Sequence, residues 1–112
     1  MSFDVIILKP IDISIEDLSE IDNIEQLGKR EIVEHIVNQS FPAAVDGVWL
    51  TDEFSVEALL SGEPVDSIHL TLRFGDSWSE NSETQFLKRI ESICQKLQSV
   101  AFSVSDNTRL AP

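Results

Sequence analysis

Two neighbouring segments of the chain alternate between apolar and polar side chains, and a short turn sequence joins them. Residues 54–60 form the first segment and residues 67–74 the second. A period of two is that of a β-strand with one buried face and one exposed face. Gly and Pro in the connecting Ser61-Gly62-Glu63-Pro64 favour a turn. The chain therefore predicts an antiparallel hairpin, and with it a sheet that has one face toward a core. The apolar side chains of that face are Phe54, Val56, Ala58, Leu60, Ile68, Leu70, Leu72 and Phe74.

Two other segments have the period of an amphipathic helix. Residues 80–97 carry acids early and bases late, which suits the helix dipole, and Ser79 or Ser82 can cap the first turn. Residues 29–40 predict a shorter helix that begins after Gly28 and ends before Pro42. Each helix has a single apolar stripe and therefore covers one face of a sheet. The stripes are Phe86, Leu87, Ile90, Ile93, Cys94 and Leu97 in the long helix, and Ile32, Val33, Ile36 and Val37 in the short one.

Further strands are expected at 3–8, 47–51 and 100–104, and the tail adds a short final hairpin arm. Residues 11–27 are acidic and irregular, with N-cap signatures at 14–17 and 22–25 that favour a short helical turn. This order of elements predicts a two-layer α+β sandwich, in which a mostly antiparallel sheet of about five strands has both helices packed on one face. Residues 1–112 are expected to form a single domain. The other sheet face is expected to be partly exposed.

The net charge of the chain indicates which class of partner it can bind. Twenty Asp and Glu residues against eight Lys and Arg residues give a net charge of −12. No Lys or Arg occurs in the 42 residues between Arg30 and Arg73. A field of this sign repels nucleic acid and anionic membranes and attracts basic proteins. The sequence therefore predicts a basic protein partner and neither nucleic acid nor membrane. The carboxylates of this stretch are Glu31, Glu34, Asp46, Asp52, Glu53, Glu57, Glu63 and Asp66.

The compartment is predicted from the start of the chain and from its cysteine content. The first ten residues contain a short apolar run interrupted by Asp4, which is not the pattern of a signal peptide. No apolar stretch approaches the roughly 18 residues that a membrane-spanning helix needs. Cys94 is the only cysteine, so an intramolecular disulfide is impossible. A cytoplasmic location is the simplest expectation.

The exposed face of the predicted hairpin brings several polar side chains together. Pairing across the turn places Glu57 opposite Thr71, with His69 and Arg73 as diagonal neighbours. Such a group can be a solvated face with a Glu57–Arg73 or Glu57–His69 ion pair, a recognition surface, or an acid/base site.

Two tryptophans are candidate contacts for a partner, because Trp is enriched among interface hot spots. Trp49 is expected on the open face, since Val48 and Leu50 suit the core. Trp78 lies in a polar loop ahead of the second helix, where it can fold back over the end of the core or anchor a partner. With Asp52, Glu53, Glu57, His69 and Arg73, these two residues complete the predicted partner-binding set.

Catalytic and metal-binding motifs are not predicted. His35, His69 and Cys94 lack the spacing of metal ligands, and Asp46, Asp52 and Glu53 lack the glycine of a calcium loop. Cys94 lies on the apolar stripe of the second helix, which predicts burial and an inert thiol. We therefore expect no cofactor, no metal site and no assigned catalytic residue.

Several short pieces of the chain form a recognisable set. They are Leu27-Gly28, Phe41-Pro42, Trp49, Phe54-Ser55-Val56-Glu57, Pro64-Val65, Ile68-His69-Leu70-Thr71-Leu72, Gly75, Ile93-Cys94 and Ala101-Phe102. Together these pieces resemble a family of small, uncharacterised bacterial immunity-protein-like proteins from toxin–immunity neighbourhoods. The resemblance covers residues 27–102 and implies a protein that neutralises a toxin. Glu57 is the polar strand position that it carries over, with no assigned role. The family pattern expects an Asp and a Thr-Gly turn after the last strand, where this chain has Ser103 and Asp106-Asn107-Thr108.

These observations favour a non-catalytic acidic binding protein. The resemblance implies that this protein is an immunity protein. Two alternatives stay open. One is a small-molecule binder or enzyme that uses Glu57, His69 and Arg73 on the open sheet face. The other is a structural protein that associates with itself through that face, because isologous pairing of one surface is common. The sequence does not decide between a monomer and a homodimer.

Overall fold

The computed structural model describes residues 2–42 and 47–112. These residues form two α-helices and seven strands, where the sequence predicted about five strands and a final arm. Strand β7 is the predicted final arm, and the short β2 is the strand that the sequence did not predict. The helices are α1 (Arg30–Ser40) and α2 (Glu80–Leu97), and the strands are β1 (Ser2–Pro10), β2 (Ile24–Glu25), β3 (Val48–Leu50), β4 (Phe54–Ser61), β5 (Ser67–Phe74), β6 (Val100–Ser103) and β7 (Arg109–Ala111).

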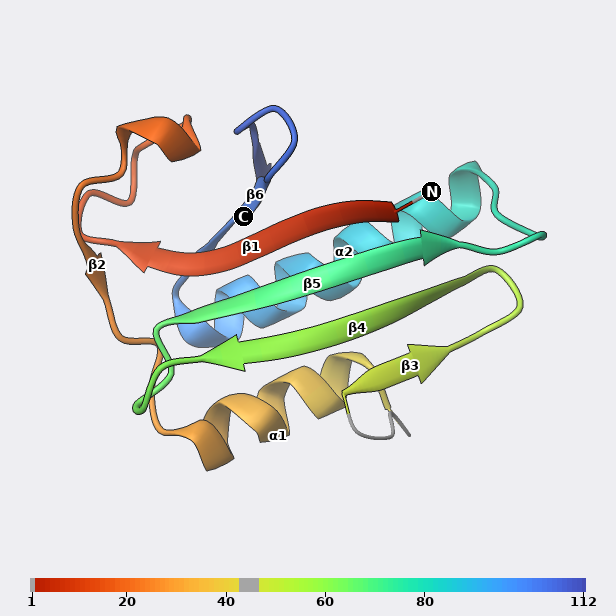
Figure 1. Ribbon diagram of the computed structural model, residues 1–112, viewed down its shortest axis with the longest axis horizontal. Coiled ribbons are helices and arrows are strands. Elements are labelled where there is room, and N and C mark those ends of the chain that lie inside the picture. Colours follow the sequence, from red (N-terminus) through yellow and green to blue (C-terminus); the bar gives the residue numbers. More distant parts are fainter. Residues whose placement is uncertain (1, 43–46) are drawn as a thin grey trace.

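All strand pairs of the sheet are antiparallel, in the order β3-β4-β5-β1-β6-β7, and β2 pairs with the end of β1. The first strand of the chain therefore lies in the middle of the sheet, between β5 and β6. Helix α2 connects these two flanking strands and crosses behind β1 (Figure 1). The predicted α+β class, the antiparallel sheet and the placement of both helices on one face are confirmed.

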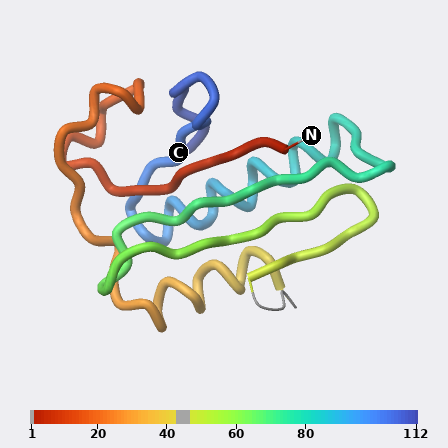
Figure 2. The backbone as a smooth tube through the Cα atoms, viewed as in Figure 1, coloured from red at the N-terminus to blue at the C-terminus, as the bar shows by residue number. Residues whose placement is uncertain are grey.

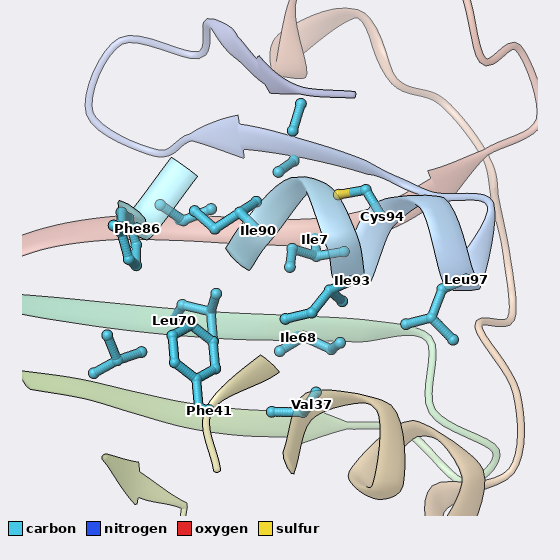
Figure 3. Packing of buried hydrophobic residues seen from close by; sticks show 14 of the residues in the cluster. Ile7, Val37, Phe41, Ile68, Leu70, Phe86, Ile90, Ile93, Cys94 and Leu97 are labelled. Carbon is cyan, nitrogen blue, oxygen red and sulfur yellow. The ribbon is translucent and has the colours of Figure 1, made fainter. Parts of the chain in front are cut away.

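The core lies between the helices and one face of the sheet. Val5 and Ile7 of β1 are fully buried against the stripe of α2, and α1 contributes Val33 and Val37 (Figure 3). The predicted stripe of α2 is confirmed, with only Leu87 half-buried. In α1 the prediction for Ile32 was wrong, because this side chain is 55% exposed. The helix turns Val33, Val37 and Ser40 toward the core instead, which leaves Ile32 at the edge of the stripe.

Helix α2 begins with a reciprocal cap that also holds a distant turn. The Ser79 hydroxyl accepts from the Ser82 amide, and the Ser82 hydroxyl accepts from the Ser79 amide. The buried Ser82 hydroxyl also donates to the Glu53 carboxylate at 2.8 Å. This contact joins the β3–β4 turn to the start of α2.

Residues 11–23 leave the sheet after β1 and return across its second face. Leu18 and Ile21 pack against a small cluster formed by Leu8, Val100 and Phe102. Asp17 caps a single 3-10 turn, Leu18–Glu20, so the expected helical turn forms there. Figure 2 shows this excursion beside the end of β1. The segment therefore covers the β1–β6 half of the face that the helices leave free.

The second predicted N-cap signature, at residues 22–25, was wrong. Ile24 and Glu25 form strand β2 because the end of β1 offers a partner: Ile24 pairs with Pro10, and Glu25 with Lys9. The Glu25 carboxylate lies 3.7 Å from the Lys9 ammonium group.

Candidate functional site

The β3–β4–β5–β1 half of the second sheet face remains uncovered by the 11–23 segment, and we call it the open face. Its central row is formed by Glu57, Thr71 and Asp4 on three adjacent strands. The next row is formed by Leu59, His69 and Ile6. The predicted position of Glu57 opposite Thr71 is confirmed, as is the common face of Glu57, His69 and Arg73. The open face comprises Asp4, Ile6, Val48, Leu50, Ser55, Glu57, Leu59, His69, Thr71 and Arg73.

A hydrogen-bonded group centres on Asp4, which the sequence analysis did not select. The Asp4 Oδ1 atom lies 3.1 Å from the His69 Nε2 atom and accepts from the Thr71 hydroxyl at 3.1 Å. The hydrogen bond from His69 is the main reason that the pKa of Asp4 lies below its usual value. Burial opposes this shift, whereas the hydrogen bond from Thr71 and the charge of Arg73 add to it. This carboxylate is thus kept ionised on the open face.

The expected ion pair between Glu57 and His69 or Arg73 is replaced by the Asp4–His69 pair. The cause is the position of β1 beside β5, which brings Asp4 opposite Thr71 and diagonal to His69. The sequence predicted a strand at residues 3–8 but assigned no face to Asp4. The neighbouring strand, however, could not be identified from that local pattern. The Glu57 carboxylate makes no hydrogen bond or ion pair with any other residue that the structure describes.

Trp49 lies on the helix side of the sheet, so its predicted place on the open face was wrong. It pairs with Val56, and its ring packs against Phe41 and Phe54 with centroids 5.3 Å away in both cases. A one-residue shift in register exchanges the two faces of a strand. The large indole occupies the core side, and its neighbours Val48 and Leu50 face outward.

Arg89 of α2 stacks on the outer side of this aromatic cluster. Its guanidinium carbon lies 4.6 Å from the centroid of Trp49, and its Nη1 group donates to the Ser40 carbonyl. The sequence had assigned Arg89 only to the helix dipole, because the contact depends on how α2 and β3 meet. A cavity of about 290 Å³ beside it is lined by both polar and aromatic residues: Trp49, Thr51, Asp52, Glu53, Phe54, Gln85 and Arg89.

The open face also carries exposed apolar side chains. Leu50 is 74% exposed and Leu59 is 65% exposed. The sequence had placed Leu50 in the core, and the register of β3 overturns that prediction. Because single exposed apolar residues are common, only their combination with neighbouring carboxylates makes this face a candidate interface.

The carboxylates of the stretch without bases gather on α1 and around β4. Glu57 lies midway along β4, with Asp52 and Glu53 before one end and Glu63 and Asp66 after the other. Four bases lie near these carboxylates. Arg30 pairs with Glu63 at 3.0 Å, and Lys29 precedes the first turn of α1. Arg73 lies diagonal to Glu57 on the open face, and Arg89 lines a cavity together with Asp52 and Glu53. Asp46 lies outside the described residues. We call Glu31, Glu34, Asp52, Glu53, Glu57, Glu63 and Asp66 the acidic margin.

The other candidate residues have structural surroundings. Trp78 is half-buried and folds back over the end of the core, 5.4 Å from Phe54 and 4.7 Å from Phe74 between ring centroids. Burial raises the pKa of the Cys94 thiol to about 12, so the thiol is protonated at neutral pH. Among residues 2–42 and 47–112, no three His, Cys, Asp or Glu side chains gather as a metal site would require.

Neither described helix is both long and apolar enough to span a bilayer. Comparison of the chain with protein-family models, curated proteins and solved structures gives no match.

Proposed function

We propose that this protein is a non-catalytic binding protein that captures a basic protein through its open face and acidic margin. The observation that carries the proposal is the position of Glu57, whose exposed carboxylate lies on the same face as the exposed Leu50 and Leu59. Such a surface offers a basic partner both apolar area and unpaired negative charge.

The two components of this surface act on different steps of binding. Carboxylates at the margin steer a positively charged partner and raise the association rate, and salt screens this effect. Leu50 and Leu59 are removed from water only in the complex, which stabilises it by about 25 cal/mol per Å² of apolar area buried. Removal of these leucines therefore raises the dissociation rate.

The resemblance to immunity-protein-like proteins supports one version of this proposal. In that version the basic partner is a toxin, and the protein neutralises it by covering its surface in the cytoplasm. Binding by occlusion requires no catalytic group on this chain. Glu57 and His69 line none of the cavities beside α1, beside Arg89 and beneath Trp78, whereas Leu59 of the open face lines the one beside α1.

The proposal is tested by capture from a lysate of the native host, followed by kinetics with the purified partner. The charge variant is Glu31→Gln/Glu34→Gln/Glu57→Gln. Its matched control is Glu16→Gln/Glu20→Gln/Asp22→Asn, which has the same net charge but is changed on the 11–23 segment. We expect a basic partner whose association rate falls at least about tenfold with the charge variant and is retained with the control.

A second variant, Leu50→Ser/Leu59→Ser, is expected to raise the dissociation rate and leave the association rate nearly unchanged. Equal loss of binding in the charge variant and its control would contradict an interface at the open face and the acidic margin. If no partner is captured and sedimentation shows a concentration-dependent dimer that the leucine variant abolishes, the open face is a self-association surface instead.

A further inference from the structure

A cavity of about 280 Å³ lies at the end of the sandwich that is distant from the 61–66 turn. None of the residues of the open face lines this cavity. Strand β6 pairs only with Val5–Leu8 of β1, so the first residues of β1 lie beyond that ladder and beneath the start of α2. The space between them is incompletely filled. Its lining residues are Phe3, Leu72, Phe74, Trp78, Glu83, Phe86, Leu87 and Leu110.

Aromatic rings form much of this cavity. Trp78 stands edge-to-face with Phe74 at an interplanar angle of 74°, and it also contacts Phe54 at 83°. Phe86 is buried at the floor, whereas Phe74 is 39% exposed at the mouth. Packing against two phenyl rings holds the indole in place, so the aromatic walls exist before a ligand arrives. The faces of such rings attract cations through their quadrupoles.

Among the residues that the structure describes, Glu83 is the only charged one in the lining. It lies on the first turns of α2, it is exposed, and its carboxylate makes no hydrogen bond or ion pair with any other described residue. No Lys or Arg lines the cavity. Because Glu83 is exposed, water solvates its carboxylate when a neutral ligand is bound, whereas a cationic ligand gains an attractive charge contact with it. An anion would be repelled by this carboxylate and by the net charge of −12.

We propose that this cavity binds a small hydrophobic amine, with the apolar group among the aromatic rings and the ammonium group beside Glu83. The volume is slightly below the range of about 300–1,000 Å³ typical of sites for drug-sized ligands, which suits a single ring or a branched alkyl group. Aromatic walls and one carboxylate supply the two contacts that such a cation requires. This site is separate from the open face, so it does not depend on the proposed function.

The test compares three probes of nearly the same shape: phenethylamine, phenethyl alcohol and phenylacetate. The Trp49→Phe variant leaves Trp78 as the only tryptophan, so its fluorescence reports the cavity directly. We expect saturable binding of the amine, binding of the alcohol that is weaker by about two- to fivefold, and still weaker binding of the anion. Equal affinity for amine and alcohol would overturn the assignment of a cation.

Two single variants, made in the chain that keeps Trp49, test which carboxylate contacts the amine. Binding of the probes to each variant is measured by ligand-observed NMR. Glu83→Gln is expected to weaken amine binding by about two- to fivefold and to leave alcohol binding unchanged. Glu80→Gln is the matched control, because it removes the same charge from the same end of α2 without lining the cavity. Equal effects of the two variants would show that the field of the chain, and no particular carboxylate, attracts the amine.

Leu87→Phe fills the cavity from its half-buried wall and is expected to abolish binding of all three probes while the melting temperature is retained. A folded Leu87→Phe variant that binds the amine as the unsubstituted chain does would place the ligand elsewhere and overturn the proposal.

Discussion

At the scale of single residues, Asp4 connects β1 to the polar side chains of β5. Its carboxylate accepts from His69 and Thr71, and its lowered pKa means that the folded state favours the ionised form. A carboxyl group with a lowered folded pKa stabilises the fold above its ordinary pKa of 3.8. That contribution is lost as the pH falls through the lower pKa of the folded state.

The variant Asp4→Asn tests this linkage. We expect it to cost less than about 1 kcal/mol at pH 6, because the group is partly exposed and solvent screens it. The difference in free energy of unfolding between the two proteins should narrow as the pH falls from 6 toward 3. Urea denaturation at several pH values measures it. A difference that stays constant over this range would show that Asp4 acts through packing rather than through its charge.

Arg89 is a second residue whose contacts extend beyond its own element. Its guanidinium stacks on Trp49 and donates to the Ser40 carbonyl at the end of α1, and Ser40 is buried. The side chain thus joins α2, β3 and α1.

Replacement of Arg89 by Ala is expected to destabilise the protein by about 1–3 kcal/mol, because the Ser40 carbonyl loses its donor and the stack on Trp49 disappears. Arg89→Lys should recover only part of this loss, since an ammonium group cannot stack as a planar guanidinium does. Urea denaturation followed by fluorescence measures both. Full recovery by Lys would show that only the charge matters.

At the scale of elements, the start of α2 depends on a turn that is distant in sequence. Ser82 belongs to the reciprocal cap and also donates to Glu53 in the β3–β4 turn. The cap therefore fixes the helix and one end of the acidic margin together.

We expect Ser82→Ala to lower the free energy of unfolding by about 1–2 kcal/mol, because the cap is lost and the Glu53 carboxylate loses its partner. Glu53→Gln alone should cost less, and the two changes together should be non-additive. A double-mutant cycle measured by thermal unfolding gives this coupling, with the exposed Ser77→Ala as control. Strict additivity would show that helix and turn are independent.

At the scale of the whole molecule, the sheet has two differently covered faces. Both helices pack on one face, and residues 11–23 cover only the β1–β6 half of the other through Leu18 and Ile21. Part of this sheet is thereby protected from water, while the open face stays available for a partner.

The variant Leu18→Ser/Ile21→Ser is expected to cost about 2–4 kcal/mol and to expose Leu8 and Phe102 to solvent. Increased binding of a hydrophobic dye at native conditions, together with a lower urea midpoint, would show this exposure. Ile11→Ser is the control, because Ile11 is 64% exposed and should change neither quantity. Unchanged dye binding in the double variant would mean that the 11–23 segment protects no apolar surface.

Much of the local structure was predictable from the chain. The limits of α2, the span of β5 and the pairing of Glu57 with Thr71 follow from side-chain periodicity and from the turn at 61–66, and each depends only on residues close in sequence. The failures lie at positions that periodicity defines weakly. Trp49 and Leu50 are on a three-residue strand, where a shift of one residue reverses the inward and outward positions, and Ile32 is at the edge of the apolar stripe of α1.

The sequence by itself determined both helices and the longer strands, that the fold is α+β, and that eight of the twenty carboxylates fall in one stretch without Lys or Arg. These properties depend on the order of side chains along the chain. Only the tertiary structure decided that β1 lies between β5 and β6, which brings Asp4 to His69, and that Arg89 meets Trp49. The tertiary structure also left a cavity beneath Trp78. Contacts between distant segments depend on the lowest free energy of the whole packing, which local periodicity does not contain.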